Sequence, residues 1–121
     1  MATAYKVLGM TGAAGSFGNG AETLTAAANK NVYTVPASKA AVVSSIIICN
    51  QAASSATYRI AIRPGGTAAD SRHYIVYGAT VAASDSTVLT LGLTLATTDI
   101  VTVFASASTL SFSLYGSELD A

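Results

Sequence analysis

The stretch Ala40–Cys49, AAVVSSIIIC, is the longest β-branched run in the chain. Valine and isoleucine carry two heavy atoms on Cβ, which restricts their rotamers and suits them to the pleated surface of a strand. One face of the extended run would hold Val42, Ile46 and Ile48, and the other Val43, Ile47 and Cys49. Because a strand that is apolar on both faces is covered on both, the run predicts the central strand of a sheet, or a strand between the core and a neighbouring subunit.

Shorter alternating segments surround this run. In TYRIAIR, residues 57–63, apolar side chains alternate with Arg59 and Arg63, which predicts a half-buried antiparallel strand with both arginines on one face. In TVLTLGLTL, residues 87–95, leucine recurs at strict period two and places Leu91 in the core. The other predicted strands cover residues 4–9, 32–36, 73–82, 100–105 and 110–115, with residues 116–121 as a short tail.

Turn residues separate these segments at regular intervals. Asp70, Asp85 and Asp99 all fall in predicted turns, where aspartate bonds its own backbone. Gly78 interrupts a predicted strand and indicates a bulge or a bend. Seven to eight short strands with this spacing predict an all-β fold, an antiparallel β-sandwich of the jelly-roll or Ig-like kind.

The segment Met10–Asn31 differs from the rest of the chain. It holds four glycines among alanine, serine, threonine and asparagine, a composition that predicts a loop or arm. We therefore divide the chain into residues 1–31, an N-terminal strand with a Gly-rich arm, and residues 32–121, the sandwich domain. Phe17 and Leu24 are large apolar side chains within the arm, so we expect them to anchor it on an assembly.

The composition argues for assembly and against several partners. Hydrophobic residues make up 51% of the chain and charged residues 10%, against about 25% charged in an ordinary soluble domain. A surface so poor in charge predicts a homo-oligomer, with a trimer expected. The formal net charge of zero predicts no nucleic-acid partner, and no apolar run is long enough to predict a membrane span. The N-terminus lacks a secretory signal pattern, so we expect synthesis in a cytoplasm.

No residues form a convincing catalytic or metal site. His73 is the single histidine and Cys49 the single cysteine, too few for a structural zinc site. Cys49 ends an apolar run and is expected to be a buried core residue. We therefore expect no enzyme activity, no cofactor and no metal. Arg59 and Arg63 are interpreted as interface residues that pair with a neighbour or keep a sheet face hydrated, and the tyrosines as core or interface residues that also suit a carbohydrate site.

The sequence from Val32 onward resembles a known group of proteins. It carries VYTVPA, then VVSSIIICN, YRIAIRP, the leucine-rich TVLTLGLTL, TDIVTVFAS and SFSLYGSE. This pattern resembles small virion structural proteins of tailed bacteriophages. These motifs are structural and include no catalytic residues.

The resemblance implies a place in the virion. The function expected from it is a capsid decoration or cement protein that stabilises the head shell through subunit contacts, made in the host cytoplasm. Its expected partners are copies of itself and the major capsid protein or other virion proteins. The alternatives are a tail, neck or fibre-associated component, or a β-sandwich module that binds a carbohydrate or a receptor.

Overall fold

The part of the chain that the structure describes forms eight β-strands, arranged as two antiparallel sheets. The computed structural model describes residues 3–11, 28–67, 71–107 and 109–121. The strands are β1 (Thr3–Thr11), β2 (Ala28–Thr34), β3 (Lys39–Asn50), β4 (Ala56–Arg63), β5 (Tyr74–Val81), β6 (Ser86–Leu95), β7 (Ile100–Ala105) and β8 (Leu110–Asp120). Two 3-10 helices, η1 (Pro64–Gly66) and η2 (Ser71–His73), lie between β4 and β5. Within the described part of the chain, no helix is long and apolar enough to cross a membrane.

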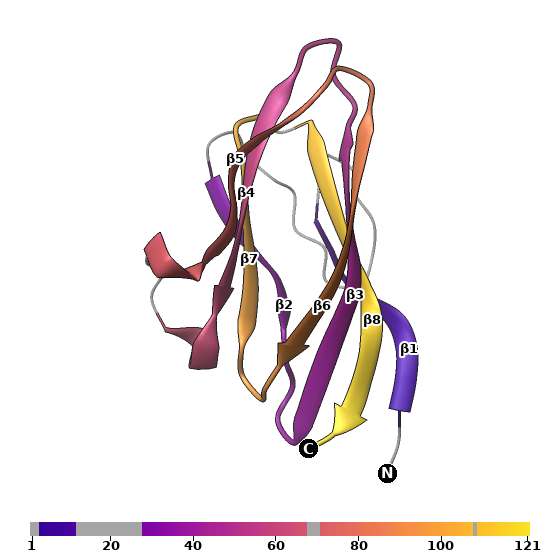
Figure 1. Ribbon diagram of the computed structural model, residues 1–121, viewed down its shortest axis with the longest axis vertical. Helices are drawn as coiled ribbons and strands as arrows, with labels where there is room; N and C mark the ends of the chain where they lie inside the picture. The colour runs from indigo at the N-terminus through magenta and orange to yellow at the C-terminus, as the bar shows by residue number, and fades with distance from the viewer. Residues whose placement is uncertain (1–2, 12–27, 68–70, 108) are drawn as a thin grey trace.

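The strand order identifies the kind of sandwich. One sheet has the order β1-β8-β3-β6 and the other β2-β7-β4-β5, and they face each other in Figure 1. The first strand pairs with the last, the second with the seventh, the third with the sixth and the fourth with the fifth. The two halves of the chain therefore form one long hairpin folded across two sheets, which is the jelly-roll arrangement. The all-β sandwich prediction is confirmed, and of its two named kinds the connectivity is the jelly roll.

A bulge at the centre of the first sheet decides which side chains enter the core. Pairing of β3 with both neighbours shifts register between Val43 and Ser45. An extra residue in one strand reverses the alternation of faces beyond it. Val43 and Ile46 are consequently both fully buried, although strict alternation would put them on opposite faces. The predicted division of this strand into two faces is therefore wrong beyond Ser44.

The bulge also determines the position of Cys49. Ile47 and Cys49 lie on the outer face of the sheet, opposite Ser113 and Ser111 of β8. Cys49 is half-buried rather than fully buried, so its predicted position in the core is wrong. The core side of the same strand holds Ile46 and Ile48 instead.

Gly116 is the partner of Val43 in β8, where the two backbones approach closely. A Cβ atom at Gly116 would lie 1.9 Å from the carbonyl oxygen of Val42, so only glycine fits there. The strand continues through this glycine to Asp120, and Lys39 pairs with Asp120 at its end, Nζ to Oδ1 2.6 Å. The prediction that residues 116–121 form a tail is therefore wrong, because the glycine is needed inside the sheet.

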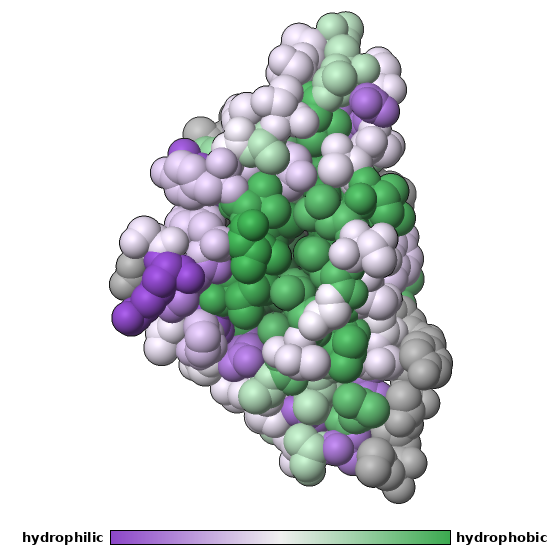
Figure 2. Space-filling view, viewed as in Figure 1, coloured by the Kyte–Doolittle hydropathy of each residue, from purple (hydrophilic) through white to green (hydrophobic). Residues whose placement is uncertain are grey.

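The leucines of β6 face inward as predicted. Leu89, Leu91 and Leu93 pack against the core, and Leu95 is buried. Leu91 is half-buried because β6 is an edge strand with a neighbour on one side only among the described residues. Figure 2 shows apolar side chains exposed on the side of the sandwich where β5 and β6 lie.

Side chains in the turns fix the loops to the sheets. The Asp99 carboxylate accepts hydrogen bonds from the backbone N–H groups of Gly65 (2.8 Å) and Ala96 (2.9 Å), and Asp85 accepts one from Ser86 (2.8 Å). The predicted backbone-bonding role of turn aspartates is confirmed at these two positions. Asp70 lies outside the described residues.

Two further predictions, for Gly78 in β5 and for the N-terminal residues 1–31, can be compared with the structure. Gly78 has φ +75° and lies at a register shift between β4 and β5, so the predicted bulge is confirmed. Residues 3–11 pair with β8 and residues 28–31 with β7, so both ends of the expected N-terminal part belong to the sheets. Residues 12–27, with Phe17 and Leu24, lie outside the described residues, and the arm stays a prediction.

Replacing Gly116 with alanine should destabilise the protein strongly. The added methyl group would overlap the Val42 carbonyl oxygen, and forcing the two strands apart should lower the free energy of unfolding by about 1–3 kcal/mol or more. Gly92→Ala is the matched control, since a Cβ on this β6 glycine meets no atom within 4 Å. Urea unfolding of both variants checks the prediction, and equal stability of the two would contradict it.

Candidate functional site

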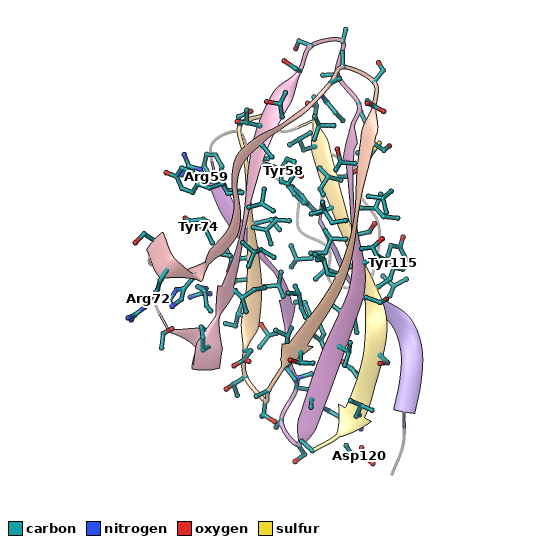
Figure 3. The ribbon with its side chains drawn as sticks, in the orientation of Figure 1. Tyr58, Arg59, Arg72, Tyr74, Tyr115 and Asp120 are labelled. Atoms are coloured by element: carbon teal, nitrogen blue, oxygen red, sulfur yellow. The ribbon has the colours of Figure 1, made fainter. Side chains whose placement is uncertain are left out.

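Strand β4 carries two arginines on the outer face of the second sheet. Arg59 and Arg63 alternate with Ile60 and Tyr58, which are buried between the sheets. In Figure 3, Arg59 points away from the opposite sheet whereas Tyr58 points toward it. The predicted common face of the two arginines is therefore confirmed.

Arg59 lies between two aromatic rings. Its partners in register are Tyr77 on β5 and Phe104 on β7, so the three side chains form one row across the sheet. The guanidinium carbon lies 4.2 Å from the centre of the Tyr77 ring and 4.5 Å from that of Phe104. Tyr74 meets Tyr77 edge to face, with ring centres 5.1 Å apart. We call these four residues, Arg59, Tyr74, Tyr77 and Phe104, the arginine–aromatic cluster.

The cluster is both rigid and accessible. Cation–π contacts on two rings hold the Arg59 guanidinium in place, and Tyr77 is 66% exposed. Within the described part of the chain, no hydrogen bond or ion pair engages the Arg59 guanidinium. Its five N–H donors therefore remain available to a ligand.

Arg63 has a different role on the same face. Its Nε donates to the Thr102 hydroxyl (3.0 Å), one terminal nitrogen to Asn31 Oδ1 (3.0 Å) and the other to the backbone oxygen of Thr67 (3.0 Å). Thr102 also donates to Asn31 Oδ1 (2.9 Å). This network ties β2, β4 and β7 to the loop after η1, so Arg63 is occupied inside the subunit.

The two sheets carry charge very differently. The strands of the second sheet contain no aspartate or glutamate, and Arg59 and Arg63 lie on its outer face. Arg72, on the short helix before β5, lies on the same side in Figure 3. Arg59 and Arg63 therefore place positive charge on the outer face of this sheet in a protein whose formal net charge is zero.

Three strands of the first sheet, β3, β6 and β8, present uncharged outward side chains. These include Val42, Ser45, Ile47 and Cys49 on β3, Val88, Thr90 and Thr94 on β6, and Ser111, Ser113 and Tyr115 on β8. We call this set the uncharged face. Ile47 and Val88 are cross-strand partners on this face, with Val88 on the edge strand β6, and Val88 is 61% exposed. Tyr115 points outward from this sheet in Figure 3.

A buried pair of polar side chains joins the sheets. The Tyr33 hydroxyl on β2 donates to a carboxylate oxygen of Glu118 on β8, 2.5 Å away, and both residues are buried. Burial first, then the hydrogen bond to Glu118 and its negative charge, raise the pKa of Tyr33 above its ordinary value of 10.0. The Tyr33 hydroxyl is the donor, so the pair links the two sheets through a buried hydrogen bond.

The described residues show no arrangement suited to metal binding. Over residues 3–11, 28–67, 71–107 and 109–121, no three histidine, cysteine, aspartate or glutamate side chains gather in one place. His73 ends the short helix η2 and is half-exposed.

Of the four predicted interface residues, the structure describes two and places them on one face. Arg59 and Arg63 share a face, whereas Phe17 and Leu24 lie outside the described residues. Tyr77 was assigned a core, interface or carbohydrate role with the other tyrosines, but neither Tyr77 nor Phe104 was predicted beside Arg59, because non-local strand pairing brings them there. The available signal was the alternation in residues 73–82 and 100–105, which places one aromatic side chain on the outer face of each strand.

Comparisons with known proteins add no relative. No protein-family model, no curated protein and no solved structure matches the chain.

Tyr33→Phe should weaken the fold, and more so than Tyr58→Phe. Removing the hydroxyl deprives the buried Glu118 carboxylate of a hydrogen bond, which should lower the free energy of unfolding by about 1–3 kcal/mol at neutral pH. Tyr58 is equally buried but its hydroxyl has no hydrogen-bond partner among the described residues, so Tyr58→Phe should cost much less. Chemical unfolding at pH 7 provides the comparison.

The same pair predicts a dependence on alkaline pH. The raised pKa of Tyr33 means that the folded state keeps this proton while the unfolded state loses it above pH 10.0. The contribution of this protonated tyrosine to the free energy of unfolding is fully present below pH 10.0. It decreases as the pH rises toward the pKa of Tyr33 in the folded state. The unfolding free energy of Tyr33→Phe should therefore fall less steeply above pH 10.0 than that of the unchanged protein. Parallel curves for the two proteins would refute this linkage.

Proposed function

We propose that the protein is a virion structural protein of a tailed bacteriophage, a capsid decoration or cement protein that stabilises the head shell through subunit contacts. The observation that carries this proposal is the uncharged face of the first sheet. A decoration protein binds the capsid in many copies through a contact surface, and it requires no catalytic site.

The uncharged face has the composition of a buried contact. Interfaces are depleted of charged residues at their centre, and on this sheet no charged side chain points outward from β3, β6 or β8 between Lys39 and Asp120 at one end and Asp85 at the other. Serine and threonine surround the apolar pair Ile47 and Val88. Small polar side chains around an apolar centre can be desolvated at a lower cost than charged ones.

The edge of this sheet supports the same proposal. Monomeric proteins protect edge strands with lysine, proline or inward charges, yet β6 has ten residues and none of these. Apart from the register shift opposite Ser44, the edge has no such protection, and it is suited to contact with another chain. Two kinds of partner would cover this edge. One is another copy of the chain in a homo-oligomer, with a trimer expected, and the other is the major capsid protein or another virion protein.

The fold and the sequence resemblance point in the same direction. Jelly rolls occur in viral capsid proteins, and also in lectins and cupins, so this likeness alone is an analogy. The resemblance of residues from Val32 onward to virion proteins of tailed bacteriophages selects among those uses. A tail, neck or fibre-associated position would use the same uncharged face, and locating the protein in a map of the intact particle distinguishes these positions.

A lysine on the uncharged face should abolish assembly without unfolding the subunit. Thr90 is exposed on β6 and faces outward, so Thr90→Lys adds a charge at the proposed contact without entering the core. Thr80→Lys is the matched control, since Thr80 is exposed on β5 of the other sheet. Sedimentation velocity should show an oligomer for the unchanged protein and Thr80→Lys, and a monomer for Thr90→Lys.

Binding to particles tests the virion role itself. Purified heads lacking the protein should take up Thr80→Lys in many copies and should fail to take up Thr90→Lys. A monomer at micromolar concentration for the unchanged protein, together with no uptake by heads, would count against the proposed function.

A further inference from the structure

We propose that the arginine–aromatic cluster is a binding site for carboxylate-bearing saccharides, such as chains of uronic acids. This role goes beyond the structural one, and it uses the opposite sheet. Neither assembly through the uncharged face nor attachment to a particle requires an arginine held between two aromatic rings on the second sheet.

The cationic centre of the site is prepared before any ligand arrives. Arg59 lies between the rings of Tyr77 and Phe104, at 4.2 and 4.5 Å from their centres, so little side-chain freedom remains to be lost on binding. Its guanidinium is planar and matches a carboxylate through two parallel hydrogen bonds. No described carboxylate neutralises it, and the strands of its sheet include no acidic residue.

The aromatic side chains supply the second half of the recognition. A sugar ring has apolar C–H faces and a polar rim, so it fits a flat site made of exposed rings and fixed polar groups. Tyr77 is 66% exposed, and Tyr74 stands beside it edge to face at 5.1 Å. Arg59 and Tyr74 project from the same outer face in Figure 3. A carboxylate on Arg59 and a sugar face on Tyr77 can therefore be engaged by one ligand.

A nucleic acid fits this face less well than a saccharide. Binding to single strands combines stacking with a positive groove that follows several phosphates. Here the second arginine of the strand, Arg63, is already used by Thr102, Asn31 and Thr67, and the formal net charge of the chain is zero. One available arginine between aromatic rings suits a single carboxylate.

Titration calorimetry of the full chain with hexagalacturonate tests the site. Its methyl ester, which has the same rings without the charge, should bind about tenfold or more weakly. Arg59→Gln should bind the acid and the ester alike, Arg59→Lys should retain part of the preference, and Tyr77→Ala should weaken binding of the acid about tenfold or more. Tyr115→Ala, on the outer face of the other sheet, should bind as the unchanged protein does, and all variants should keep its melting temperature.

Several outcomes would overturn the proposal. These are no heat of binding at millimolar hexagalacturonate, equal binding of acid and ester by the unchanged protein, equal losses in Tyr77→Ala and Tyr115→Ala, or tighter binding of oligothymidylate than of hexagalacturonate. Weakening of the interaction as salt is raised supports the charged contact. Because Thr90→Lys removes the proposed assembly contact and leaves the cluster intact, binding by this variant separates the saccharide site from the virion role.

Discussion

The close approach of the β3 and β8 backbones at Gly116 is the constraint on which the rest of the sandwich depends. A Cβ atom there would lie 1.9 Å from the Val42 carbonyl oxygen. The bulge at Ser44 reverses the inward face of β3 opposite this glycine, whereas β8 keeps its alternation on both sides of Gly116. Val43 and Ile46 can then both be buried, and Ile47 with Cys49 is left outside. The uncharged face is thus a consequence of a backbone contact as much as of composition.

The jelly-roll connectivity separates two kinds of surface that are mixed along the chain. Apart from β4 and β5, consecutive strands lie in alternate sheets, so neighbours in sequence contribute to opposite sides of the molecule. The basic strand residues Arg59 and Arg63 and the aromatic residues Tyr77 and Phe104 gather on one outer face, and serine, threonine and valine on the other. A protein with formal net charge zero therefore carries a locally positive surface that its composition conceals.

Local alternation predicted most of the fold because period two is a property of each strand alone. The strand positions, the leucine face of β6 and the common face of Arg59 and Arg63 all followed from it. The bulge at Gly78 followed from the presence of a glycine inside a strand. Alternation did not predict the faces of β3 or the end of β8. The bulge in β3 and the close approach at Gly116 in β8 are both properties of the pairing between strands. The cluster around Arg59 was missed for the same reason: its two ring contacts come from β5 and β7, and their register with β4 is set by the folded sheet.

The two proposals are compatible because they use opposite outer faces of one sandwich. Packed sheets lie about 10 Å apart with the core between them, so covering the first sheet leaves the second exposed. A single site built on one arginine and one exposed tyrosine would bind a saccharide weakly, since one charged contact and one ring face supply little affinity. Many copies fixed on one particle would raise the effective concentration of these sites and convert weak contacts into firm attachment. On this argument, assembly through the uncharged face is what would make a saccharide site of this size useful.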